Sequence, residues 1–300
     1  MMMFTENCGT RAAFAKDPAV IRFKNKYYLY YSSCYEEQGE EKFGIGIAVS
    51  NDGADWLRVD KFPITQDCEK NGVAAPGAIV INGKVHLFYQ TYGNGEKDAI
   101  CHAISEDGIH FIKDNTNPIF HPTNDWCVGR AIDADVVLFG EKLFLYFATR
   151  DHAYKVQKIG VAYAAAESDF SRSTWKQGAS YAIIEPEYAW EGECIEAPAT
   201  LVWDGKIYMF YGGAYNCKPQ QIGVAVSEDG ITFKKCFEEP FLRCGDKGEW
   251  NSDESGHPYA FKDENGRVWI YYQGTNDKGC SWYLSRKEIE FKDGVPIIKS

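Results

Sequence analysis

The sequence lacks several features that mark large classes of proteins. No run of Lys and Arg occurs in its 300 residues and the formal net charge is -11, which argues against a nucleic-acid partner because phosphate binding needs clustered cations. No stretch of about 18 apolar residues is present, so no membrane span is expected. The first residues do not combine a basic segment with a long apolar one, so we expect no signal peptide and a cytoplasmic location.

Metal-site cysteine spacing is also missing. The ten cysteines are scattered and follow neither a Cys-x-x-Cys nor a Cys/His ligand pattern, so we expect reduced thiols rather than zinc ligands or a disulfide framework. Methionine is scarce, with 4 residues, whereas Tyr, Phe and Trp number 19, 18 and 8. This aromatic richness, together with the near absence of helical periodicity, predicts an all-β protein.

One phrase occurs five times along the chain. It consists of a polar or small head, an apolar strand, a turn carrying Asn, Asp, Gly or Lys, and an aromatic strand, which is the pattern of a β-hairpin. The copies read KDPAVIRFKNKYYLYYSS, AAPGAIVINGKVHLFYQT, IDADVVLFGEKLFLYFATRD, EAPATLVWDGKIYMFYGG and GHPYAFKDENGRVWIYYQG. Their heads, at positions 17, 75, 133, 197 and 257, recur about every 60 residues, as in a repeat architecture.

A second element follows each hairpin. In its clearest copy, IGVAVSEDGITF from Ile222, it predicts a third strand, a Ser-x-Asp-Gly turn and an aromatic residue that opens a fourth strand. Four strands in each of five units predict a five-bladed β-propeller with four antiparallel strands per blade. A β-sandwich would not require five copies of one phrase. No linker or low-complexity stretch divides the chain, so residues 1–300 are interpreted as a single domain.

The heads of the five blades are the candidate site. In a propeller the first strand of each blade lines the central channel, so equivalent heads meet although they are far apart in sequence. The heads are Asp17, Ala75, Asp133, Glu196 with Ala197, and His257. Carboxylates gathered in one cavity raise one another's pKa, which separates candidate acids from candidate bases.

Three of these heads carry a resemblance to a known family. KDPAV, AIDADV and IEAPA resemble the three-carboxylate signature of glycoside hydrolase family 43, whose members are five-bladed propellers that commonly act on arabinose- or xylose-containing glycans. The resemblance implies that Asp17 is the general base, that Asp133 tunes and orients the acid, and that Glu196 is the general acid. It thus implies a glycosidase with an oligosaccharide or glycoside substrate and no required cofactor, related to the families 32, 62, 68 and 117. A separation of about 6.5 Å or more between base and acid would indicate inversion of configuration.

Two departures from the family pattern leave alternatives open. Ala134, rather than the usual Pro, follows Asp133, and Asp135 is a second candidate for the same role. The segment GEC around Glu193 resembles the acid motif of the family 32 fructosidases, which would make Glu193 the acid in place of Glu196. A β-fructosidase-like retaining hydrolase is therefore an alternative, although the alignment of the blades favours Glu196.

Other residues are candidates for substrate binding. Trp126 and Trp190 lie in segments leading into the third and fourth heads, where an indole ring can stack on a sugar face. Arg130, three residues before the third head, either binds substrate or pairs with a carboxylate. Glu193 and Ala75 complete this predicted set, the alanine by leaving space beside the carboxylates.

The family resemblance raises two further possibilities. A head His in a Gly-His context, here His257, often lies beneath a central calcium ion or its waters in that family, although the sequence names no set of oxygen ligands for such an ion. Phosphorylases acting on mannosides share the fold; the sequence shows no concentrated Arg/Lys/His phosphate cluster, although Arg130, Arg150 and His152 could form one around blade three. A non-catalytic sugar-binding propeller is the third alternative, because fold alone does not confer activity. The sequence does not specify an oligomeric state.

Overall fold

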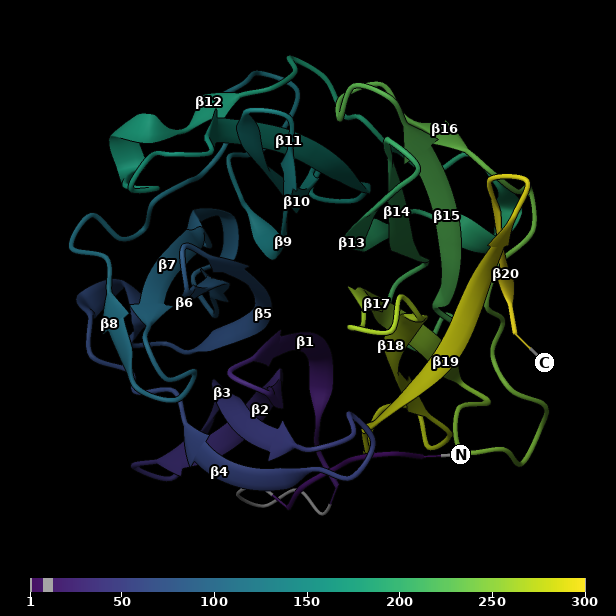
Figure 1. The fold of residues 1–300 in the computed structure, drawn as a ribbon, viewed down its shortest axis with the longest axis horizontal. Coiled ribbons are helices and arrows are strands. Elements are labelled where there is room, and N and C mark those ends of the chain that lie inside the picture. The colour runs from purple at the N-terminus through teal and green to yellow at the C-terminus, as the bar shows by residue number, and fades with distance from the viewer. Residues whose placement is uncertain (1, 8–12, 300) are drawn as a thin grey trace.

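A computed structural model describes residues 2–7 and 13–299 and has the form of a five-bladed β-propeller (Figure 1). Five four-stranded antiparallel sheets surround a central channel, which confirms the predicted fold class. Each sheet is built from one continuous stretch of chain, and its strands follow one another in sequence order from the channel outward. Only four short 3-10 helices occur in the described residues: η1 (Asp67–Glu69), η2 (Gly95–Lys97), η3 (Arg172–Thr174) and η4 (Ala189–Glu191).

The twenty strands have the following bounds. Blade 1 contains β1 (Lys16–Phe23), β2 (Lys26–Glu37), β3 (Glu40–Ser50) and β4 (Leu57–Lys61). Blade 2 contains β5 (Val73–Ile81), β6 (Lys84–Thr91), β7 (Ile100–Ser105) and β8 (Phe111–Lys113). Blade 3 contains β9 (Ile132–Phe139), β10 (Lys142–Arg150), β11 (Gln157–Ala165) and β12 (Lys176–Gln177). Blade 4 contains β13 (Ile195–Trp203), β14 (Lys206–Gly213), β15 (Gln221–Ser227) and β16 (Lys234–Lys235). Blade 5 contains β17 (Glu254–Lys262), β18 (Val268–Thr275), β19 (Tyr283–Lys292) and β20 (Val295–Ile298).

The repeated Ser-x-Asp-Gly turn has a role between blades. Within each turn the Ser hydroxyl and the Asp carboxylate accept hydrogen bonds from backbone N–H groups, as Ser227 and Asp229 do. The carbonyl of the turn glycine then accepts a hydrogen bond from a tyrosine on the second strand of the preceding blade. Three such bonds occur, at 2.9–3.0 Å: Tyr30 to Gly108, Tyr146 to Gly230, and Tyr271 to Gly53. The aromatic second strands therefore join adjacent blades by hydrogen bonds as well as by packing.

A buried carboxylate strengthens blade 4. Glu191, at the end of η4, is fully buried, and its carboxylate accepts hydrogen bonds from Tyr211 Oη at 2.8 Å and Lys235 Nζ at 2.7 Å. It also accepts the backbone N–H groups of Glu187 and Tyr188, at 2.7 and 2.8 Å. Because every oxygen of this carboxylate has a partner, its burial is offset by charge-assisted hydrogen bonds. Glu69 makes the equivalent contacts in blade 2.

The N-terminal segment pairs with blade 5 but contributes no strand to the sheet of that blade. Phe4 forms an isolated antiparallel bridge with Leu284 of β19, and the backbone N–H of Trp282 donates to the carbonyl of Ala13 at 2.8 Å. The N-terminal segment thus runs along blade 5 before β1 begins blade 1. No helix in the described ranges is long and apolar enough to cross a membrane.

The cysteines differ from expectation at one position. Cys34 is disulfide-bonded, so the prediction of uniformly reduced thiols is wrong there, and Cys8 lies outside the described residues. The other eight are free thiols: Cys68, Cys101, Cys127, Cys194, Cys217, Cys236, Cys244 and Cys280.

Candidate active site

The head of each first strand contains the same local distortion. Asp17, Ala75, Asp133, Ala197 and His257 all have positive φ angles, between 45° and 54°, and the pairing register shifts at this point in all five blades. A β-bulge of this kind re-aims a side chain, and positive φ is unfavourable for residues other than glycine. Five copies of the same strained bulge indicate that the fold specifies where these side chains point.

The strained heads are held by hydrogen bonds from neighbouring blades. The N–H of Asp17 donates to Gln273 Oε1 at 3.0 Å, and that of Asp133 donates to Gln90 Oε1 at 2.8 Å. In the fourth blade the N–H of Ala197 faces Asp133 Oδ2 at 3.4 Å. Each head is therefore fixed by the blade beside it, so the geometry of the site depends on the closed ring.

His257 lies between the two aspartates. Its Nδ1 is 3.3 Å from Asp17 Oδ1 and its Nε2 is 3.5 Å from Asp133 Oδ1. Burial alone would lower the pKa of His257, but the charges of Asp17 and Asp133 outweigh it and raise the pKa to about 9. Burial alone would raise the pKa of Asp133, yet the imidazolium of His257 and its hydrogen bond bring the net value below that of an ordinary aspartate. At neutral pH this pairing favours a charged ring and an ionised Asp133.

Glu196, one residue before the fourth head, is a buried carboxyl group of the site. Its side chain is held by two amides: Gln220 Nε2 donates to Oε1 at 2.6 Å, and Gln157 Nε2 donates to Oε2. Burial, followed by the negative charge of Asp133, raises the pKa of Glu196. A raised pKa lets a carboxyl group hold its proton to higher pH, and a carboxyl group that is also fixed in orientation is suited to donate that proton.

The two glutamines that hold Glu196 were not predicted, although the repeats contain a signal for them. Gln157 and Gln220 occupy equivalent positions, two residues before the Ile of the motif IGVA in blades 3 and 4, and Asp98 stands at that position in blade 2. Gln220 reaches the centre because residue 256 is glycine: a Cβ on Gly256 would lie 2.0 Å from Gln220 Oε1. The residues at the start of the third strands in blades 3 and 4 thus form a second ring of site residues, around Glu196.

Lys16 is a further residue that sequence reasoning did not single out. It precedes Asp17, is buried, and its Nζ lies 4.2 Å from the ring centre of Trp282. Burial lowers the pKa of Lys16, but the charges of Asp17, Glu254 and Glu196 raise it overall. Lys16 therefore adds a positive charge to the acidic centre.

The structure gives different surroundings to the residues that the sequence left as alternatives, Glu193 against Glu196 and Asp135 against Asp133. Glu193 is half-exposed and pairs with Lys155 Nζ at 2.6 Å, whereas Glu196 is only 7% exposed. Asp135 accepts a hydrogen bond from the backbone N–H of Thr200 at 2.8 Å and another from its hydroxyl. Burial raises the pKa of Asp135 to about 7. Asp133, not Asp135, carries the head distortion and faces His257.

The predicted aromatic and arginine residues have defined positions. Trp190 packs against Gly213 and stacks with Tyr211 at 6.2 Å between ring centres, and its Nε1 donates to the carbonyl of Glu238 at 2.9 Å. These contacts are those of a packing residue. Trp126 lies against β11, and its buried Nε1 has no hydrogen-bond partner within the described part of the chain.

Arg130 lies near two acidic groups. Its Nε is 3.8 Å from Asp98 Oδ2, and its positive charge contributes to the lowered pKa of Asp133. The structure therefore brings Arg130 into the polar network of the heads, where both roles predicted for it, substrate binding and pairing with a carboxylate, are open.

The channel is narrow below the heads. A cavity of about 20 Å³ is lined by Asp17, Ala75, Asp133, Ala197 and His257 together with the residues that follow each of them. The structure thus brings the five predicted heads together. A space of this size holds about one water molecule, so a sugar would have to bind above the heads, toward Glu196.

The described side chains do not supply a calcium site at His257. Both ring nitrogens already face carboxylates, and no group of three or more His, Cys, Asp and Glu suited to a metal ion occurs in residues 2–7 and 13–299. Calcium requires six to eight oxygen ligands. Because the imidazolium itself supplies positive charge between Asp17 and Asp133, the chemistry below uses no metal ion.

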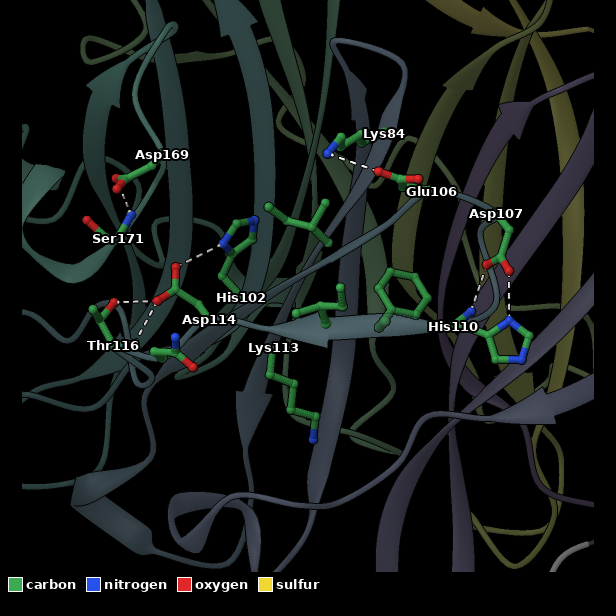
Figure 2. Close-up of a pocket in the computed structure, with 14 residues that line it drawn as sticks. Lys84, His102, Glu106, Asp107, His110, Lys113, Asp114, Thr116, Asp169 and Ser171 are labelled. Atoms are coloured by element: carbon green, nitrogen blue, oxygen red, sulfur yellow. Dashed lines mark hydrogen bonds and ion pairs between the residues drawn. The ribbon is translucent and has the colours of Figure 1, made fainter.

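A second cavity lies away from the channel. Figure 2 shows this space, of about 700 Å³, around β8 at the outer edge of blade 2. His102 points toward Asp114, with Nδ1 3.4 Å from Oδ2, and His110 Nδ1 lies 2.7 Å from Asp107 Oδ2. These groups pair with one another, and the outer strand is at the opposite edge of the sheet from the heads. The candidate active site is therefore the ring of heads.

The chain is similar to several known proteins. A 1,2-beta-oligomannan phosphorylase of Thermoanaerobacter sp. (strain X514) is 27% identical over 220 residues, which cover 71% of this chain and 68% of that protein. A beta-xylosidase of Xylanibacter ruminicola is 27% identical over 103 residues, or 34% of this chain and 27% of the xylosidase. The crystal structure of a thermostable family-43 glycoside hydrolase superimposes with a TM-score of 0.76 at 22% identity, covering 99% of this chain and 96% of that one.

A family of proteins also matches nearly the whole chain. The family described as glycosyl hydrolases family 43 matches residues 10–296, a range that reaches into all five blades. The chain therefore belongs to glycosyl hydrolases family 43.

Proposed function

We propose that this glycosidase cleaves short oligosaccharides by an inverting mechanism in which Glu196 is the general acid and Asp17 the general base. The observation that carries the proposal is that the carboxyl groups at one end of the channel have different electrostatic surroundings. Burial and a neighbouring charge raise the pKa of Glu196, whereas His257 pairs with both Asp17 and Asp133. Groups whose environments separate their protonation states are suited to be acid and base.

The reaction assigns one task to each carboxyl group. Glu196 donates its proton to the glycosidic oxygen as the bond to the leaving group breaks. Asp17, as the carboxylate, removes a proton from the water that attacks the anomeric carbon from the opposite face. Asp133 does not touch the reacting atoms. Its negative charge raises the pKa of Glu196, and after each turnover this favours reprotonation of the acid.

We further propose a pentose-containing substrate, with arabinose or xylose at the cleaved bond. Family 43 membership supports this proposal, as does the similarity to a protein named beta-xylosidase. The small volume at the heads favours an enzyme that binds one terminal sugar above them rather than one that threads a polysaccharide through the channel.

Phosphorolysis is the second candidate reaction. It is favoured by the similarity to a protein named 1,2-beta-oligomannan phosphorylase, which covers more of the chain than the similarity to the xylosidase. In that reaction inorganic phosphate would replace water as the attacking group, and the product would be a sugar phosphate instead of a free sugar.

A panel of aryl glycosides tests both candidates. α-L-Arabinofuranosides, β-D-xylosides, β-D-galactosides, β-D-mannosides and β-D-fructosides are assayed with and without phosphate, and proton NMR follows the first anomer released. We expect phosphate-independent release of the inverted pentose. Retention of configuration would refute the roles given to Asp17 and Glu196, strict dependence on phosphate would establish the second candidate, and no turnover of any glycoside would favour a sugar-binding propeller.

A further inference from the structure

Two guanidinium groups meet at one uncharged acceptor beside the proposed acid. Arg150 Nε donates to Gln157 Oε1 at 3.0 Å, and Arg130 Nη1 donates to the same oxygen at 3.4 Å. The Nε2 of this amide donates to Glu196. Gln157, only 1% exposed, therefore links both arginines to the acid and fixes their position relative to the bond that is cleaved.

The positive charge of this pair is only partly balanced. Arg150 makes no ion pair with any described residue, and its terminal Nη1 and Nη2 groups have no protein acceptor among them. The guanidinium is held from the sides instead, 4.5 Å from the ring centre of Tyr154 and 5.3 Å from that of Tyr215. Aromatic rings position a guanidinium without using its N–H donors.

Arg130 likewise has few close acceptors for its N–H groups among the described residues. Its side chain is 11% exposed and its nearest carboxylate oxygen, on Asp98, is 3.8 Å from Nε, beyond hydrogen-bond distance. The buried Nε has no hydrogen-bond partner among residues 2–7 and 13–299. Burial also raises the pKa of Asp98 despite the nearby guanidinium, which weakens this carboxylate as a counter-charge. Two like charges held together, with donors left free, are costly unless an anion joins them.

We propose that Arg130 and Arg150 form a subsite for a single oxyanion next to Glu196. The chemistry it would recognise is a carboxylate or phosphate group, because guanidinium groups bind both through paired N–H donors. This inference rests on the proposed function. Because the subsite lies beside the proposed acid, it faces the leaving-group side of the cleaved bond. The anion is then the carboxylate of a uronic acid on the leaving-group side of the substrate; inorganic phosphate bound here could not attack the anomeric carbon, because that attack comes from the opposite face.

Binding is measured first, so that the test does not depend on catalysis. Isothermal titration with D-glucuronate, inorganic phosphate and neutral D-glucose is carried out on the wild type, Arg150→Gln and Arg130→Gln. The matched control is Arg243→Gln, whose guanidinium forms an exposed ion pair with Glu239. We expect at least one anion to bind, D-glucose not to compete with it, and either site variant to weaken binding by about tenfold or more, as loss of a charge-assisted bond predicts, with no change in the control.

Two kinetic comparisons then test whether the anion belongs to the substrate. If it belongs to the substrate, kcat/KM for an aldobiouronic acid exceeds that for the matching neutral disaccharide, and Arg150→Gln removes the difference. Inorganic phosphate, as a competing anion, should raise KM for the aldobiouronic acid and leave the neutral disaccharide unaffected; equal kcat/KM for the two disaccharides would overturn the assignment. Absence of binding by both anions, or equal binding by the wild type and both folded site variants, would overturn the subsite. Neither result would affect the roles of Asp17 and Glu196, which are tested by the stereochemistry of the product.

Discussion

Replacing Glu196 with Gln tests the proposed acid while nearly preserving its shape. Both neighbouring amides are fixed in orientation: Gln157 Oε1 accepts from Arg150, and Gln220 Oε1 accepts from the N–H of His257 at 3.0 Å. Their Nε2 groups must therefore continue to face residue 196. The new amide nitrogen then opposes one of these donors, so one hydrogen bond is lost and two N–H groups confront each other. We expect a loss of about 1–3 kcal/mol in the free energy of unfolding.

The kinetic effect of the same change depends on the leaving group. Loss of a general acid lowers kcat by about 10²–10⁴-fold, or about 2.7–5.4 kcal/mol in activation free energy. A dinitrophenolate departs without protonation, so its glycoside should lose less than about tenfold, whereas an unactivated phenol should show the full loss.

The assay compares kcat/KM of the wild type and the Glu196→Gln variant over a series of aryl glycosides of the accepted sugar. Urea unfolding of both proteins provides the control that the variant is folded. An equal loss for all leaving groups would refute proton donation by Glu196. A variant as stable as the wild type would refute the clamp by two fixed amides.

Three other substitutions separate the remaining roles. Asp17→Asn should lower turnover equally for all leaving groups, because water activation is lost in every case; a loss confined to poor leaving groups would contradict this. Asp133→Asn removes a charge that raises the pKa of Glu196, so the alkaline limb of the kcat/KM profile, where the acid loses its proton, should move to lower pH; an unmoved limb would argue against this coupling. Glu191→Gln removes the close counter-charge of the buried Lys235 ammonium group and leaves only the exposed Glu187, at 3.7 Å. It should cost about 3–5 kcal/mol in urea unfolding, against about 0–1 kcal/mol for the exposed control Glu228→Gln; equal losses in the two variants would contradict this.

The fold and the ring of heads follow from the repeats. Five copies of one phrase predict five blades, and alignment of the copies places Asp17, Asp133 and His257 at equivalent heads. The structure brings these three side chains into one polar cluster. This was predictable because a propeller converts equal positions in sequence into neighbouring positions in space.

The second ring of residues, around Glu196, was harder to predict because it depends on how the strands are placed relative to one another in space. Gln157 and Gln220 begin or precede third strands, which are normally remote from the channel, yet both reach Glu196. The approach of Gln220 requires the missing side chain at Gly256. Arg150 likewise ends a second strand, and only the structure shows that it shares Gln157 with Arg130. Repeat alignment could have identified the two glutamines, but not their partners.

The most direct test of the central claim is a crystal structure of the Glu196→Gln variant with an uncleaved oligosaccharide that the wild type hydrolyses. The mechanism requires the glycosidic oxygen within about 3 Å of the residue 196 side chain, with a water molecule between the opposite sugar face and Asp17. A substrate bound elsewhere, for instance in the cavity around β8, or a sugar whose anomeric carbon is remote from Asp17, would contradict the account.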